Sequence, residues 1–209
     1  MKIEEAYNLW ALQYDTNQNK TRDLEAIALK NTLSKIPFDN CLEIGCGTGK
    51  NSLWLMEKAK HLTGVDFSDE MLAKAKEKIQ SDKVDFLKAD ITKTWAFADK
   101  KYDLVTFSLV LEHISHLDFI FNQAKTVLTV GGYVYIGELH PYKQYVGSKA
   151  RFENEDDIQM VDCFTHHLSD FLLSAKENGF SIQDINEYFD DDNRNEMPRI
   201  LTILLKKEN

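Results

Sequence analysis

The feature that most constrains the fold is a short apolar run leading directly into a glycine-rich turn, Cys41-Leu42-Glu43-Ile44-Gly45-Cys46-Gly47-Thr48-Gly49-Lys50. An apolar run of this length, bounded by turn residues, is typical of a buried strand. Glycine lacks a Cβ and adopts positive φ at little cost, so alternate glycines predict a turn whose backbone comes close to a ligand. The spacing Gly-x-Gly-x-Gly differs from the Gly-x-Gly-x-x-Gly of dinucleotide-binding turns, which disfavours a nicotinamide dehydrogenase.

An acidic side chain, Glu43, lies inside this apolar run, two positions before Gly45. A carboxylate at the mouth of a site suits a ligand with positive charge better than one that carries phosphates. Two interpretations of Glu43 have equal weight. It either holds the loop by accepting backbone hydrogen bonds or contacts the ligand directly.

Composition and charge narrow the classes of protein that remain. The chain has 209 residues, of which 43% are hydrophobic and 28% charged, as expected for one globular domain covering 1–209. Its formal net charge of −9 argues against a nucleic-acid partner, because basic clusters supply most of that affinity. We find neither a signal peptide nor an apolar run that would span a bilayer, and the three cysteines lack metal-ligand spacing. We therefore expect a cytoplasmic protein with reduced thiols, no membrane association and no metal.

Helix and strand patterns alternate along the chain, which predicts a parallel sheet covered by helices. The irregular stretch 140–166 is typical of a loop or lid on the substrate side, and 1–36 reads as a helical cap. Strands are predicted at 41–44, 61–65, 84–88, 103–108, 133–138, 181–189 and 200–206, and helices at 2–14, 24–33, 51–58, 69–79, 117–128 and 167–178.

Several polar residues follow the predicted strands directly. In an open parallel sheet, ligands bind at the carboxyl ends of the strands. Asp66 follows the glycine turn at close to the interval at which an acid meets a ribose in nucleotide-binding sheets. Asp90, after the third strand, is suited to accept a hydrogen bond from an adenine amine. These residues predict an adenosine-like ligand with a compact cationic group and no phosphate.

Six motifs in this order and spacing resemble the class I S-adenosylmethionine-dependent methyltransferases of the small-molecule type. The resemblance covers most of the chain, from Tyr14 to about Phe189. Its motifs are Leu42-Glu43-Ile44-Gly45-Cys46-Gly47-Thr48-Gly49, Val65-Asp66-Phe67-Ser68, Ala89-Asp90, Tyr102-Asp103-Leu104-Val105, Leu111-Glu112-His113-Ile114 and Leu128-Thr129-Val130-Gly131-Gly132-Tyr133.

The resemblance implies an α/β fold and a cofactor. The fold is a Rossmann-like, doubly wound, seven-stranded sheet with an antiparallel C-terminal hairpin, in a three-layer αβα sandwich. The cofactor is S-adenosyl-L-methionine, which leaves as S-adenosyl-L-homocysteine. The resemblance implies that Gly45, Cys46 and Gly47 contact the methionine part, that Asp66 binds the ribose and that Asp90 binds the adenine. It implies that Phe67 and Ile91 flank the adenine ring and that the Ser108–Leu109 backbone approaches the amino group. Tyr14 is expected to be a neighbour of the cofactor.

The catalytic group is less evident, because methyl displacement needs a general base only when the nucleophile has a proton to lose. His140 follows the fifth strand at the rim expected for substrate, and His167 opens a helix after the irregular stretch. Both are candidate bases, since histidine titrates near neutral pH. His113 is expected to pack behind the fourth strand.

The acceptor expected from these observations is a small molecule, used by a monomer or homodimer. The fourth strand ends in Phe107-Ser108-Leu109-Val110, without the Asn/Asp-Pro-Pro-aromatic run of amino-directed nucleic-acid methylases. Two alternatives stay open: methylation of a macromolecule, and a catalytically silent module or scaffold that binds the cofactor.

Overall fold

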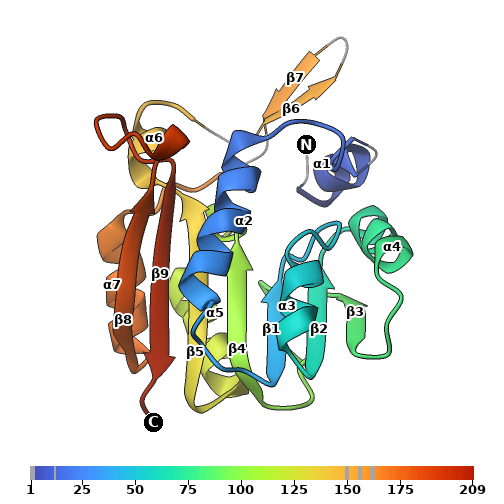
Figure 1. The fold of residues 1–209 in the computed structure, drawn as a ribbon, viewed down its shortest axis with the longest axis vertical. Helices are drawn as coiled ribbons and strands as arrows, with labels where there is room; N and C mark the ends of the chain where they lie inside the picture. The colour runs from blue at the N-terminus through green and yellow to red at the C-terminus, as the bar shows by residue number, and fades with distance from the viewer. Residues whose placement is uncertain (1–2, 12, 149–150, 155–156, 161–162) are drawn as a thin grey trace.

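A computed structural model describes residues 3–11, 13–148, 151–154, 157–160 and 163–209. Its centre is a seven-stranded sheet with the order β3-β2-β1-β4-β5-β9-β8 (Figure 1). Neighbours from β3 to β5 are parallel, whereas β9 is antiparallel to both β5 and β8. This confirms the predicted sheet and its antiparallel C-terminal hairpin. The strands are β1 (Asn40–Ile44), β2 (His61–Asp66), β3 (Val84–Lys88), β4 (Tyr102–Ser108), β5 (Leu128–Leu139), β8 (Phe180–Tyr188) and β9 (Ile200–Lys207).

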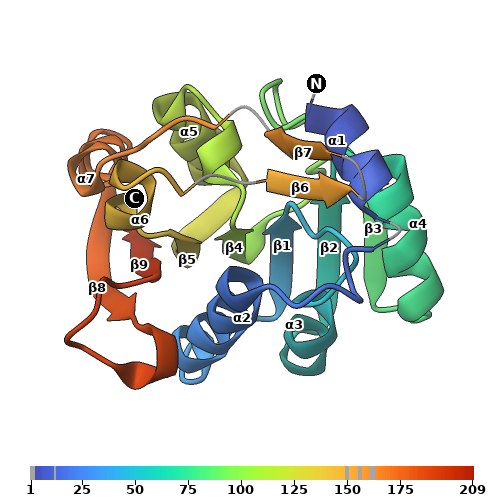
Figure 2. The ribbon, with the colours of Figure 1, turned by 90° about the horizontal axis from the view of Figure 1, so that it is seen from above.

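Helices cover both faces of this sheet and form the outer two layers (Figure 2). On one face lie α2 (Lys20–Leu33) and α3 (Ser52–Lys58), and on the other lie α5 (Leu117–Val127) and α7 (Leu168–Glu177). Two more helices lie at the β3 side, α1 (Ile3–Trp10) and α4 (Asp69–Lys78). Ser68 caps α4 by accepting a hydrogen bond from the Met71 N–H, which fixes the start of that helix directly after β2.

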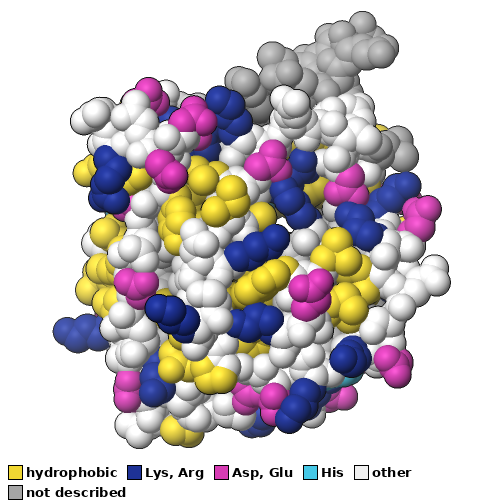
Figure 3. Space-filling model, viewed as in Figure 1, with side chains coloured by type: hydrophobic (Ala, Val, Ile, Leu, Met, Phe, Trp, Pro, Cys, Tyr) yellow, Lys and Arg dark blue, Asp and Glu magenta, His cyan; other side chains and the backbone are white. Residues whose placement is uncertain are grey.

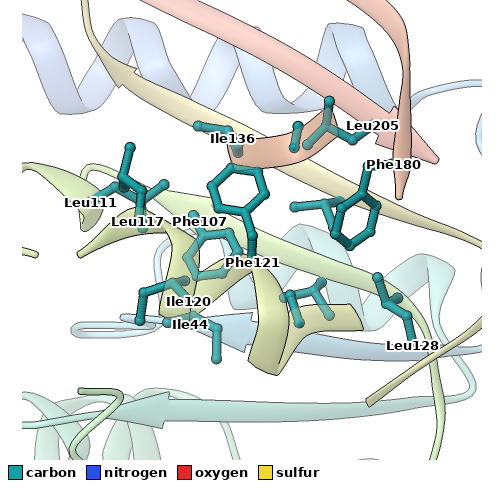
Figure 4. Close-up of a cluster of buried hydrophobic side chains, with 14 of the residues drawn as sticks. Ile44, Phe107, Leu111, Leu117, Ile120, Phe121, Leu128, Ile136, Phe180 and Leu205 are labelled. Carbon is teal, nitrogen blue, oxygen red and sulfur yellow. The ribbon is translucent and has the colours of Figure 1, made fainter. Parts of the chain in front are cut away.

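The larger core lies between the sheet and the α5–α7 layer. Phe121 and Ile120 of α5 pack against Phe107 of β4 and Ile136 of β5, and the Phe121 and Phe180 rings meet edge to face, with centroids 6.2 Å apart (Figure 4). A second cluster seals the opposite face through Leu29, Leu33, Leu55 and Tyr135, among others. Burial on both faces explains why the central strands read as continuous apolar runs.

Two element boundaries differ from the predictions for a local reason. Helix α1 ends at Trp10 instead of reaching Tyr14, because the chain turns at Gln13, whose carbonyl accepts from the Thr16 and Asn17 N–H groups. Helix α2 begins at Lys20, earlier than predicted, because the Asn19 side chain accepts from the Arg22 N–H and caps it.

The stretch 140–166 contains regular structure in its described parts. It holds α6 (Pro141–Tyr145) and a hairpin of β6 (Arg151–Asn154) and β7 (Asp157–Met160), while 149–150, 155–156 and 161–162 lie outside the described residues. The hairpin lies beyond the carboxyl ends of the parallel strands (Figures 1 and 2). Two short 3-10 turns complete the fold, η1 (Leu111–His113) and η2 (Asp190–Asp192).

The surface mixes basic, acidic and apolar side chains on the face seen in Figure 3, without a basic stripe. Within the described residues, every helix is too short or too polar to cross a bilayer.

Candidate functional site

The glycine turn after β1 has the backbone conformation that its sequence predicts. Gly45, Gly47 and Gly49 all have positive φ, and the Gly45 and Cys46 N–H groups donate to the Val65 carbonyl at 2.8 and 3.0 Å. A Cβ on Gly45 would lie 2.2 Å from Val110 Cγ2, whereas a Cβ on Gly47 would meet nothing nearer than Tyr14 at 4.0 Å. Packing therefore requires glycine at 45, and Gly47 leaves open space in front of the turn.

Asp66 joins this turn to the end of β2. Its Oδ2 accepts from the Gly47 N–H at 2.8 Å, and its Oδ1 accepts from the Ser68 N–H at 2.9 Å. Desolvation raises the pKa of Asp66, although these backbone N–H groups favour the ionised form. Each carboxylate oxygen keeps a lone pair that can accept from a ligand hydroxyl.

A cavity of about 160 Å³, here called the inner cavity, opens in front of these groups. It brings together residues from the ends of β1, β2, β3 and β4, as the sequence predicts for an open parallel sheet. Of the predicted cofactor residues, those that line it are Tyr14, Gly45, Gly47, Asp66, Phe67, Asp90, Ile91, Ser108 and Leu109.

The two remaining predicted cofactor residues, Glu43 and Cys46, line an adjoining side cavity of about 40 Å³. Glu43 is 3% exposed, and its Oε2 accepts a hydrogen bond from the Ser52 hydroxyl at the start of α3. Desolvation raises the pKa of Glu43 to about 8, and the negative charges of Glu25 and Asp66 act in the same direction. A cation bound nearby would favour the ionised carboxylate.

The turn after β4 is strained and held from below by a second buried acid. Leu109 has a φ of 57°, a left-handed conformation that costs a non-glycine residue about 1–2 kcal/mol. The Glu138 Oε1 atom accepts from the Val110 and Leu111 N–H groups at 2.9 and 2.8 Å, which stabilises this turn. Backbone strain of this kind gathers at functional sites. Leu109 and Tyr14 line all three cavities, so these cavities meet there.

The third and largest cavity, here called the large cavity, has a volume of about 880 Å³. Tyr7 lines both it and the inner cavity. Two of its residues were not predicted as site residues: Arg22, which carries no motif, and Glu112, which belongs to the Leu111–Ile114 motif but was given no role there. Arg22 also lines the side cavity, lies 4.5 Å over the Tyr14 ring and donates to the Tyr14 carbonyl. No local signal singled out Arg22, because the predicted helix began only at residue 24.

The candidate bases His140 and His167 do not line any of these three cavities in the described part of the chain. The His140 Nδ1 atom accepts from the Tyr142 N–H, so its Nε2 donates to Glu187 Oε1 at 3.0 Å. His167 Nδ1 lies 2.6 Å from the Tyr145 hydroxyl on an exposed surface. Their roles as bases stay predictions.

His113 lies elsewhere than expected. It lines the inner cavity from η1, and its Nε2 is 2.8 Å from the Tyr7 hydroxyl. Across the described residues, no group of three or more His, Cys, Asp or Glu side chains is arranged to hold a metal ion.

Comparison with known proteins agrees with this arrangement. Residues 42–136, from β1 into β5, match the family model described as a methyltransferase domain. This match supports a class I, S-adenosylmethionine-dependent methyltransferase, in agreement with the six sequence motifs. The matched residues include the glycine turn, Asp66, Asp90 and the strained turn at Leu109.

Individual relatives of this chain are distant. An uncharacterized methyltransferase of Emericella nidulans is 25% identical over 221 residues, covering 87% of this chain and 77% of that protein. A demethylmenaquinone methyltransferase of Leptospira interrogans is 30% identical over 142 residues, covering 62% of this chain and only 57% of the relative.

Among solved structures, an S-adenosylmethionine-dependent methyltransferase of Mesorhizobium loti superposes with a TM-score of 0.74 at 20% identity. That match covers 89% of this chain and 100% of the other. At this identity the likeness establishes the fold.

Proposed function

We propose that this protein transfers a methyl group from S-adenosyl-L-methionine to a small-molecule acceptor by in-line displacement. The observation that carries the proposal is the inner cavity, where the glycine turn, Asp66 and Asp90 converge from three strand ends. The acidic side chains of the site fit the cofactor, because carboxylates accept hydrogen bonds from ribose hydroxyls and an adenine amine, and buried acids suit cationic groups.

The residues of this chain have separable tasks in this proposal. S-adenosylmethionine, when bound, supplies an electrophilic methyl carbon on a positively charged sulfur. Asp66 and Asp90 would hold the adenosine part, with Phe67 and Ile91 on either side of the adenine ring. The open space at Gly47 and the side cavity with Glu43, Cys46 and Arg22 would take the methionine part, where Arg22 suits its carboxylate.

Positioning and exclusion of water are the main demands of such a displacement. We assign the covering role to the two segments next to the site, 1–36 and 140–166. Segment 1–36 contributes Tyr7, Trp10 and Tyr14 to the wall of the large cavity. Segment 140–166 contributes Val146, Gly147 and Ser148. The large cavity, which meets the inner cavity at Tyr7, Tyr14 and Leu109, is then the site of the acceptor.

A small-molecule acceptor is supported by the charge of −9, which disfavours a nucleic acid, and by a relative that is named a demethylmenaquinone methyltransferase. The first experiment is calorimetry with S-adenosylmethionine, S-adenosylhomocysteine and NADH, followed by transfer of labelled methyl groups across a metabolite library. We expect micromolar binding of the first two ligands. Binding of NADH in their place would refute the proposal.

Removal of the predicted ribose acid gives a sharper test. We expect Asp66→Ala to weaken cofactor binding by about 1.5–3 kcal/mol, the scale of a lost hydrogen bond to a charged group. The exposed acid Asp82, changed to alanine, is the matched control and should bind as the wild type does. Calorimetry on both variants, with circular dichroism to check folding, makes the measurement. Unchanged affinity in a folded Asp66→Ala protein would exclude Asp66 from the site.

A further inference from the structure

Glu112 is a buried carboxylate in the wall of the large cavity to which no role has yet been given. It lies on η1 and is 7% exposed. Cys163 and His113 interact with its carboxyl group, but its Oε2 atom is buried without a hydrogen-bond partner among the described residues. Its backbone carbonyl accepts from the Phe164 N–H at 2.7 Å, which anchors this position. A buried polar atom without a partner is costly, so a ligand that donates a hydrogen bond to it would be favoured.

The position of Glu112 is next to the junction of the large and inner cavities. The adjacent residue, His113, lines the inner cavity and lies 2.8 Å from the hydroxyl of Tyr7, which lines both cavities. A group held at Glu112 would therefore stand close to the boundary across which the methyl group has to pass.

Two buried acidic side chains lie close together at η1. Glu138, directly below η1, also has a buried Oε2 without a partner, and no salt bridge between described residues involves Glu112 or Glu138. The basic residues that line the cavity, Lys20, Arg22 and Arg199, come from the start of α2 and of β9. Helix α2 covers the face of the sheet opposite to α5, which follows η1 (Figure 2). Desolvation raises the pKa of both acids, to about 8 for Glu138, so a bound cation would stabilise their ionised forms, whereas a bound carboxylate would not.

We propose that the acceptor is a primary or secondary amine, cationic at neutral pH, whose N–H group Glu112 binds. This inference rests on the proposed function and names the acceptor class of the same site. The ammonium gives one proton to the Glu112 carboxylate, which leaves a neutral nitrogen with a free lone pair. That lone pair forms the new bond to the methyl carbon, the carbon–sulfur bond breaks, and its electron pair stays on sulfur, giving a neutral thioether. Glu112 then releases its proton to solvent.

The experiment compares three acceptors on one skeleton with the wild-type protein. We would offer 2-phenylethylamine, 4-ethylphenol and 3-phenylpropanoic acid, and then longer members of each series, with labelled S-adenosylmethionine. We expect methyl transfer to amines at least 10-fold faster than to either other series. Binding of the same amines to the protein without cofactor, measured by calorimetry, gives a readout that does not depend on turnover.

Substitution of the carboxylate tests its role. Glu112→Gln is expected to lower the turnover of amines by about 10²–10⁴-fold, the usual contribution of a general base, with cofactor affinity within about 2-fold of wild type. Glu112→Asp keeps the carboxylate and should retain part of the activity that Glu112→Gln loses. If Glu112→Gln does not fold, the turnover of Glu112→Asp is compared with that of the wild type instead. Glu57→Gln, an exposed acid on α3, is the matched control and should leave turnover unchanged.

The outcomes separate this inference from the proposed function. Failure to bind S-adenosylmethionine would refute both. If the cofactor binds but phenols or carboxylic acids are the preferred acceptors, or if no amine binds or is methylated, the inference about amines is wrong and the methyltransferase proposal stands. Full turnover in Glu112→Gln would remove the carboxylate from the reaction.

Discussion

At the scale of single residues, the site is notable for carboxylates that are desolvated before any ligand arrives. Glu43 is the clearest case, because its pKa of about 8 leaves it largely protonated at neutral pH in the folded protein. In the unfolded chain the same group ionises near its ordinary value of 4.5. Folding thus takes up a proton at Glu43, and the stability that this uptake contributes is complete below pH 4.5 and lost as the pH rises to 8.

This linkage predicts how Glu43→Gln changes the pH dependence of stability. The amide stands in for the protonated acid, so the variant and the wild type should be similar in stability near pH 4.5. As the pH rises to 8, the variant should become relatively more stable, by up to about 5 kcal/mol. Urea unfolding of both proteins at several pH values measures the difference. A difference in unfolding free energy that does not change with pH would contradict the raised pKa.

At the scale of an element, the turn between β1 and α3 shows why glycine is needed for two separate reasons. Gly131 has positive φ but lies in open space, because a Cβ there would meet only the end of the Lys206 side chain at 4.0 Å. Alanine at position 131 would therefore carry backbone strain alone. Gly45 combines positive φ with a Cβ position 2.2 Å from Val110. The turn after β1 and the turn after β4 are thus packed directly against each other.

We expect Gly45→Ala to be much more destabilising than Gly131→Ala. The backbone strain common to both should cost about 1–2 kcal/mol, and the overlap with Val110 should add about 1–3 kcal/mol at position 45 only. Chemical denaturation of the two variants separates these contributions. Equal losses of stability would show that the Val110 side chain moves away without cost.

At the scale of the whole molecule, ligand binding should stabilise the folded state, because the site is assembled from strand ends that separate on unfolding. At 100 times its dissociation constant, a ligand adds about 2.7 kcal/mol, which corresponds to a rise in Tm of about 5–10 °C for a chain of this length. We expect this rise with S-adenosylmethionine and with S-adenosylhomocysteine. NADH at the same concentration is the control, and an equal rise with NADH would contradict the proposed ligand class.

Most of the elements were predictable because their signals are local. Continuous apolar runs and helical spacing depend only on neighbouring residues. The apolar runs located the strands of the sheet to within a residue or two, except at the start of β5. The errors arose where a local signal was overridden or overlooked. The helical spacing of 2–14 is interrupted by the turn at Gln13. Strand β5 begins at Leu128, where the sequence predicted the end of a helix, and Leu128 pairs with Tyr102 of β4.

The sequence by itself determined which residues stand at the carboxyl ends of the parallel strands, since chain order and strand direction bring Gly45, Asp66, Asp90 and Ser108 to one edge. Only the tertiary structure decided what surrounds the large cavity. Tyr7 and His113 meet across 106 positions, and Glu112 is buried there without a partner. It also showed that His140 is hydrogen-bonded to Glu187. The physical reason is that burial and long-range contacts depend on how distant elements pack, and no local pattern in the chain records that packing.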